Sequence, residues 1–184
     1  MRERDYHICK VEMPMYERYD KAVENNDAKE LAWFAQFGSE KWESQMITNA
    51  RSYEQYLKCG YTGEPVFNEH GWLDNGHCLE LKEKAEFVPV FKDDQYRANV
   101  MILQHPNGKW IATAEYNFSI SGGGAYPSIW STQYPTRRDA LNAVLDQLIS
   151  HIENSTVQKD KKYLSIIRKM RGTTCQLSLF DNFE

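Results

Sequence analysis

Apolar residues recur every three or four positions through the first third of the chain, and this spacing predicts helices. A charged, tyrosine-rich stretch over residues 15–25 fits a first helix. Asp27 is placed to cap a second helix, and Gly38 to end it. A third helical pattern begins at Ser39. The sequence therefore predicts a helical N-terminal region over residues 1–60.

The composition changes at residue 60. Residues 60–76 are crowded with Gly, Pro, Asn and Asp, which are turn-forming residues. Phe67 and Trp72 are the large apolar side chains of this stretch, and we expect both to hold the loop against the core.

Alternating patterns follow and predict an antiparallel sheet. Residues 87–91 suit a short edge strand, because Pro89 has no N–H to donate to a neighbouring strand. Residues 98–104 suit a second strand. Residues 109–121 alternate regularly, with one face apolar and the other face more polar, which is the clearest strand signal in the chain.

Three consecutive glycines follow the alternating segment. We expect Gly122–Gly124 to break the strand, as a bulge or a wide hairpin turn, and residues 125–132 to return as a fourth strand. Thr136 is then a suitable N-cap for a long helix, with Asp139 at the acidic position of a capping box. Five apolar residues of this helix recur at helical spacing and can cover the sheet: Leu141, Val144, Leu145, Leu148 and Ile152.

Residues 159–171 form a basic amphipathic pattern that predicts a last helix, and Gly172–Thr174 is expected to end it. The fold class predicted from these patterns is α+β: N-terminal helices, an antiparallel sheet of three or four strands covered by a long helix, and a flexible C-terminal tail. We expect residues 1–60 and the α+β core of residues 61–171 to pack as one domain, with residues 172–184 as the interaction tail.

The composition indicates that the chain folds and in which cellular compartment we expect it. Of the 184 residues, 41% are hydrophobic, which is enough for a packed core and excludes wholesale disorder. The four cysteines show no paired spacing, so free thiols in a reducing compartment are expected. With no apolar run long enough for a membrane span and no leader-like N-terminus, we expect a cytoplasmic protein without a membrane partner.

The last ten residues carry an unusual cluster of apolar side chains. The segment Gln176, Leu177, Ser178, Leu179 and Phe180 resembles the motif by which bacterial replication and repair proteins bind the DNA sliding clamp. The resemblance implies that Gln176 hydrogen-bonds at the rim of a pocket on the clamp. It also implies that Leu179 and Phe180 fill an apolar cavity. Leu177 and Ser178 would bridge from Gln176 to these two residues. The alternative is that these apolar residues pack on their own domain.

Two basic groups are candidates for contact with nucleic acid, although the formal net charge is -4 and gives no general attraction to phosphate. Their members are Arg137 and Arg138 at the start of the long helix, and Lys161, Lys162, Arg168 and Lys169 in the last one. Residues 98–153 also resemble, loosely, the β-β-β-α half of a double-stranded-RNA-binding domain, but the lysines that this family carries at the helix start are missing. Solvated helix faces are the alternative for both groups.

The sequence contains no recognised catalytic or nucleotide-binding motif, so we expect no enzyme activity, no cofactor and no bound metal. Cys59, His70, His77 and Cys78 could in principle be combined into a zinc site, but their spacing fits no regular pattern.

Three functions are consistent with these features. The first is an accessory binding protein of a phage or another mobile element, recruited to the replication machinery through the clamp motif. The second is an anti-defence inhibitor, acting against a CRISPR or restriction nuclease, whose acidic N-terminal half imitates nucleic acid. Its surface would be formed by an acidic stripe of Glu12, Glu17, Asp20 and Glu24 together with Glu40, Glu43 and Glu54. The third is an enzyme of nucleic-acid metabolism without a recognisable motif.

Overall fold

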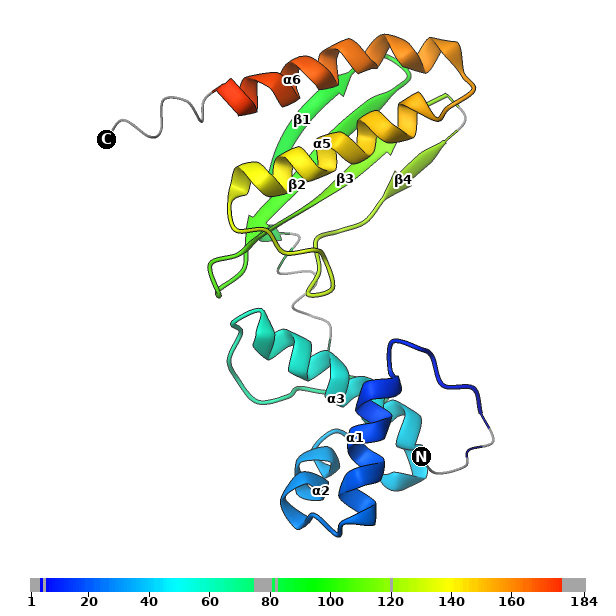
Figure 1. Ribbon diagram of the computed structural model, residues 1–184, viewed down its shortest axis with the longest axis vertical. Helices are drawn as coiled ribbons and strands as arrows, with labels where there is room; N and C mark the ends of the chain where they lie inside the picture. The colour runs from blue at the N-terminus through cyan, green and yellow to red at the C-terminus, as the bar shows by residue number, and fades with distance from the viewer. Residues whose placement is uncertain (1–3, 5, 75–80, 82, 120, 177–184) are drawn as a thin grey trace, which may run out of the picture. The chain divides into compact units, whose positions relative to one another are not determined.

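A computed structural model describes residues 4, 6–74, 81, 83–119 and 121–176 of the chain. The chain divides into two compact units, Met1–Gly76 and His77–Glu184, and each is described by itself. Helices and a four-stranded antiparallel sheet confirm the α+β class (Figure 1). None of the helices in the described ranges has both the length and the apolar character needed to cross a bilayer.

The first unit is helical, as its periodicity predicts. Asp27 caps the second helix as expected, because its carboxylate accepts the backbone N–H of Glu30 at 3.1 Å. The pattern that begins at Ser39 opens with a short 3-10 turn before it becomes an α-helix. The elements are α1 (Met13–Glu24), α2 (Ala28–Ala35), η1 (Glu40–Trp42) and α3 (Glu43–Lys58).

The turn-rich segment after α3 belongs to the helical unit, which extends to Gly76. The buried amide of Asn49 holds it: Nδ2 donates to the carbonyl of Gly71 at 2.9 Å, and Oδ1 accepts the N–H of Leu73 at 2.9 Å. Leu73 is buried, whereas Trp72 is 44% exposed. The expectation that Trp72 anchors this loop was therefore wrong, and the polar contacts of Asn49 explain how the loop is held.

The second unit contains a sheet with strand order β1-β2-β3-β4 in which neighbouring strands are antiparallel. β1 is the edge strand predicted around Pro89, and its register shifts between Pro89 and Phe91. The β2–β3 connection turns at Gly108, whose φ of 82° suits glycine. The strands are β1 (Glu86–Lys92), β2 (Arg97–Gln104), β3 (Trp110–Asn117) and β4 (Gly122–Gly124).

The three glycines form the outer strand β4 instead of a bulge or a turn, and residues 125–132 do not form a strand. Both expectations for this region were wrong. β4 pairs with the end of β3, from Glu115 to Asn117, and this pairing compensates for the weak strand propensity of glycine. Glycine also leaves space for the neighbouring ring, since a Cβ atom at Gly123 would lie 2.8 Å from the hydroxyl of Tyr116.

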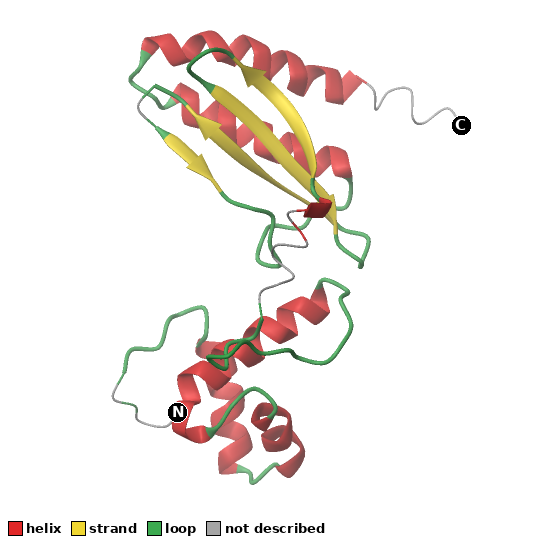
Figure 2. Ribbon diagram, turned by 180° about the vertical axis from the view of Figure 1, so that it is seen from behind, coloured by secondary structure: helices red, strands yellow, loops and turns green. Residues whose placement is uncertain are grey.

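Two helices cover one face of the sheet (Figures 1 and 2). α5 (Arg137–Glu153) packs on β2 and β3, and α6 (Leu164–Gln176) follows the 3-10 segment η2 (Gln158–Tyr163) and packs beside β1. Thr136 is the N-cap as predicted, because its Oγ1 accepts the N–H of Asp139 at 3.1 Å, and its hydroxyl donates to the Asp139 carboxylate at 2.7 Å. All five predicted apolar residues of α5 are buried in the core.

α6 continues beyond the predicted stop. Gly172–Thr174 was expected to end the helix, but α6 runs to Gln176. Glycine ends a helix most effectively in a left-handed conformation, and Gly172 is not among the glycines with positive φ. A glycine within a helix costs about 1 kcal/mol relative to alanine, which the helix tolerates here. The tail therefore begins later than residue 172.

Candidate functional site

α6 is the element that precedes the clamp-like motif. Its buried side is formed by Leu164, Ile167 and Met170, which pack against the core together with Tyr163. The opposite side is open to solvent, and Ile166 is 45% exposed.

The motif begins at the last residue of α6. Gln176 ends the helix, whereas Leu177, Ser178, Leu179 and Phe180 lie outside the described residues. Gln176 comes six residues after Met170, so at about 1.5 Å per residue the helix advances roughly 9 Å between them. α6 therefore carries the start of the motif past the last residue that packs on the core.

Asp93 fixes the start of this helical segment to the β1–β2 turn. It accepts hydrogen bonds from the hydroxyl of Tyr163, from the backbone N–H groups of Gln95 at 3.0 Å and Tyr96 at 2.8 Å, and from Lys162 at 3.2 Å. These donors favour the ionised carboxylate, and the pKa of Asp93 is held well below its usual value, chiefly by the Tyr163 hydroxyl. Burial, followed by the bond to Asp93, raises the pKa of Tyr163.

The predicted basic groups are not brought together into one uncompensated patch. Arg137 forms a two-point contact with Glu86, at 3.0 and 2.5 Å, across 51 residues of sequence. Lys162 pairs with Asp93. Arg168 pairs with Glu153 at 2.5 Å. Exposed ion pairs of this kind are weak, so the cation can leave its carboxylate for a phosphate group. Each pair is nevertheless close to neutral and attracts phosphate only slightly.

Three of the candidates lack such a partner. Within the described ranges, Arg138, Lys161 and Lys169 form no ion pair. These are the cations best able to attract phosphate without first breaking an internal contact, so contact with nucleic acid stays a prediction for this smaller group.

The expected β-β-β-α order is present as β2, β3, β4 and α5. It is embedded in a larger unit that also contains β1 and α6. Such an arrangement of elements does not determine function. The helix entry that would have to meet RNA carries Arg137, which is already engaged by Glu86.

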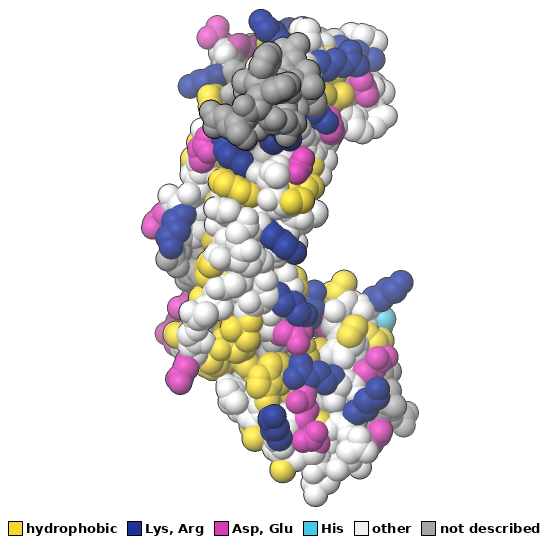
Figure 3. All heavy atoms as spheres, turned by 60° about the vertical axis from the view of Figure 1, so that its left-hand side comes forward, with side chains coloured by type: hydrophobic (Ala, Val, Ile, Leu, Met, Phe, Trp, Pro, Cys, Tyr) yellow, Lys and Arg dark blue, Asp and Glu magenta, His cyan; other side chains and the backbone are white. Residues whose placement is uncertain are grey.

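The acidic stripe predicted on α1 is not a continuous surface. Asp20 is 2% exposed, and Arg4 donates to its carboxylate at 2.7 Å and to Glu43 at 2.7 Å. The two carboxylates raise the pKa of Arg4, with the bond to Asp20 the largest cause. Glu12 accepts a hydrogen bond from Thr48 at 2.8 Å. On the face shown in Figure 3, basic and acidic side chains of this unit are intermingled, which weakens the case for imitation of nucleic acid.

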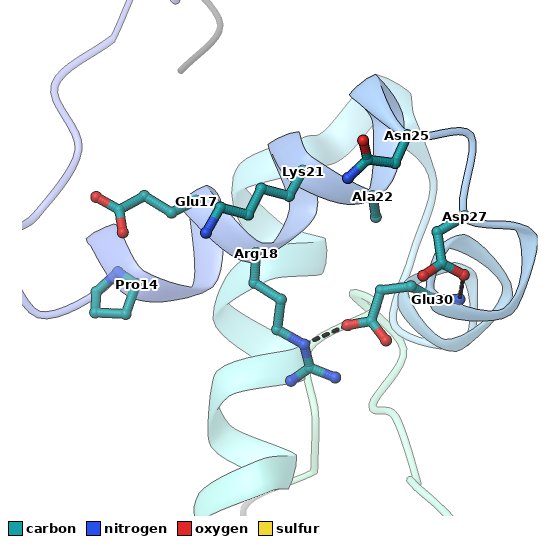
Figure 4. A pocket seen from close by; sticks show the side chains of 8 residues that line it. All are labelled: Pro14, Glu17, Arg18, Lys21, Ala22, Asn25, Asp27 and Glu30. Atoms are coloured by element: carbon teal, nitrogen blue, oxygen red, sulfur yellow. Dashed lines mark hydrogen bonds and ion pairs between the residues drawn. The ribbon is translucent and has the colours of Figure 1, made fainter.

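A hollow of about 340 Å³ lies between α1 and the start of α2 (Figure 4). Two of its charged groups, Arg18 and Glu30, bond to each other. Arg18 bonds to Glu30, pairs with Glu54 at 3.1 Å, and stacks its guanidinium 4.2 Å from the ring centre of Trp33. Arg18 therefore acts as a structural link among the three helices and is not free to receive a ligand.

The residues considered for zinc do not form a site in the described part of the chain. Cys59 is buried, whereas His70 is exposed and faces Glu69 at 3.5 Å. His77 and Cys78 lie outside the described residues. Among the residues that the structure describes, no three His, Cys, Asp or Glu side chains are grouped as a metal site would require.

Sequence reasoning did not single out a second cavity, of about 450 Å³, between the β3–β4 edge and α5. Tyr116, Gln147 and His151 contribute to its lining. The only sequence signal near it is the glycine run, which was interpreted as a turn. The lining residues on α5 follow those on β3 by about 30 residues in the sequence, so no local pattern could have indicated the cavity.

Comparison with known proteins places the chain in no group: no family model matches it, and no curated protein or solved structure gives a significant match.

Proposed function

We propose that this protein is an accessory binding protein that is recruited to the bacterial DNA sliding clamp through Gln176–Phe180. The observation that carries the proposal is the sequence of this pentapeptide, which follows the preferred pattern of clamp-binding motifs at each position. The protein would act by being held near DNA, not by catalysing a reaction.

The position of α6 supports the proposal. Ile167 anchors its first turns and the Asp93 network anchors η2 directly before it, whereas Gly172 and Thr173 are exposed. The helix reaches Gln176, beyond its core-packing residues. A motif that follows an anchored helix starts from a defined place on the domain. The exposed residues Gly172 and Thr173 lie between the anchored part of the helix and the motif.

The expected affinity is modest. A short peptide that becomes ordered on binding loses conformational entropy, so a Kd on the micromolar scale is expected. Leu179 and Phe180 are the two anchors of such a peptide, and truncating a buried anchor at an interface costs about 2 kcal/mol or more. Together they correspond to about 4 kcal/mol, a loss of affinity of roughly 1,000-fold.

Calorimetric titration of a purified bacterial sliding clamp with the full-length chain tests the proposal directly. The wild type should bind with micromolar Kd, and the Leu179→Ala/Phe180→Ala variant should show no measurable binding. Phe183→Ala is the matched control, because it removes an aromatic ring from the same terminal segment three residues beyond the motif. Its affinity should stay within about twofold of the wild type.

Absence of binding by the wild type would refute recruitment to the clamp. Equal loss in Phe183→Ala and the double variant would also contradict it, because the segment would then act through general hydrophobicity. A cytoplasmic location and an origin in a phage or another mobile element belong to the same proposal, since the clamp operates in the cytoplasm and no catalytic motif points to a different role.

A further inference from the structure

The outer edge of β3 has a gap in its strand pairing. β4 pairs with Glu115–Asn117, and at the other end Trp110 exchanges two backbone hydrogen bonds with Tyr134, at 2.8 and 2.7 Å. Between these contacts, residues 111–114 have no strand partner on this side within the described part of the chain. The edge is therefore bounded at both ends and open in the middle.

The open stretch presents backbone hydrogen-bonding groups. In an antiparallel sheet, alternate residues direct their N–H and C=O groups to the same side. Because Trp110 directs both groups to the outer side, Ala112 directs its own into the gap, whereas the register of β4 places Ala125 opposite Ala114. Ala112 is itself largely buried. Backbone groups in such a place require partners from water or from a bound molecule.

A cavity of about 450 Å³ lies against this gap, which is within the size range of small-molecule sites. Small residues produce the space: Ala112 and Ala114 on β3, and Gly123 and Gly124 on β4. Its two ends are blocked by β4 and by the Tyr134 bridge, so an extended peptide could not continue through it as an added strand. A compact ligand fits this shape better.

Flat side chains line one side. The rings of Tyr116 and His151 have centroids 4.9 Å apart. His151 is held in place by Ser121, whose hydroxyl lies 2.9 Å from Nε2, and by stacking against Phe118. Gln147 lies one helical turn before His151 on α5, so its amide faces the same region. The lining thus combines aromatic rings, the side-chain amide of Gln147 and backbone N–H and C=O groups of β3.

We propose that this cavity binds a neutral planar nitrogen heterocycle of the purine or pyrimidine class, as the free base or nucleoside. The backbone N–H and C=O groups of Ala112 match the adjacent acceptor and donor at the edge of a base. The rings of Tyr116 and His151 supply aromatic contacts of the kind that hold a base in nucleic-acid-binding proteins. The lining contains no Lys, Arg, Asp or Glu, so a phosphate would gain nothing there.

Calorimetric titrations with adenosine, guanosine, cytidine and uridine, and with the matching monophosphates, test this proposal on the full chain. At least one nucleoside should bind saturably, and its monophosphate should bind no more tightly. Gln147→Leu should weaken binding about tenfold or more. Gln158→Leu is the matched control, because Gln158 is also exposed but lies outside the cavity, and it should leave affinity unchanged.

Ala114→Met provides a second, steric test, since the longer side chain would occupy the cavity; circular dichroism would verify that the variant is folded. It should abolish binding. Absence of saturable binding by all four nucleosides at millimolar concentration would overturn the proposal. Binding that survives both Gln147→Leu and Ala114→Met, or that tightens with phosphate, would overturn it as well.

Discussion

Neighbouring isoleucines on α6 provide a direct test of how this helix is anchored. Ile167 is completely buried in the core, whereas Ile166 is 45% exposed. Replacing either by alanine removes the same three carbon atoms from the same helix. The difference between the two variants therefore isolates the packing of the buried face.

The expected magnitude follows from the burial. Three buried carbons at about 0.8 kcal/mol each correspond to about 2.4 kcal/mol, and the cavity left behind raises the cost of Ile167→Ala to about 3–4 kcal/mol. Because Ile166 is about half exposed, Ile166→Ala loses only about half of the 2.4 kcal/mol from burial. The better helix propensity of alanine returns about 0.4 kcal/mol, so the net loss of stability is about 0.5–1 kcal/mol. For a unit of roughly 100 residues, 3 kcal/mol corresponds to a fall in Tm on the order of 12–24 °C.

A urea titration followed through the amide resonances of β2 and β3 reports on this unit alone, even in the full chain. Ile167→Ala should shift the unfolding midpoint strongly, and Ile166→Ala only slightly. Equal shifts would refute the orientation of α6 on the sheet. Clamp binding should be retained by Ile166→Ala, because the exposed side of the helix is not part of the motif.

Two further predictions concern charge. Because the folded-state pKa of Asp93 lies below its unfolded value of about 3.9, its ionised form stabilises the protein above that pH, and this contribution is lost as the pH falls towards the folded-state value. The stability deficit of Asp93→Asn in urea titrations should thus be full at pH 7 and shrink below about pH 4; a deficit independent of pH would contradict this. Lys161→Ala/Lys169→Ala should weaken binding to a clamp loaded on DNA and reduce its salt dependence, as measured by fluorescence anisotropy, but leave binding to the free clamp unchanged. An equal effect on both forms would count against phosphate contact.

Local patterns in the sequence predicted much of the fold. The caps at Asp27 and Thr136, the alternation in β3 and the apolar stripe of α5 depend on residues within one turn or one strand of each other. Interactions over such distances are encoded by spacing, so the class and order of the main elements could be predicted without coordinates. The clamp-like pentapeptide is also a purely local signal, and it was found for the same reason.

Contacts between distant residues could not be predicted in this way. Gly122–Gly124 has a low strand propensity, yet it forms β4 because the edge of β3 supplies its hydrogen-bonding partners. The charges of Arg137 and Lys162 looked available in the sequence, but their partners Glu86 and Asp93 lie 51 and 69 residues away. Asp20 likewise belongs to a regular acidic pattern, and only folding buries it against Arg4.

The sequence by itself determined the helices, most strands and the motif that suggests a partner, since each arises from neighbours along the chain. Tertiary structure decided which charges are compensated and where a cavity lies. Both depend on which backbone and side-chain groups meet across the sheet, and the gap beside Ala112 exists only because Tyr134 and β4 pair with β3 on either side of it.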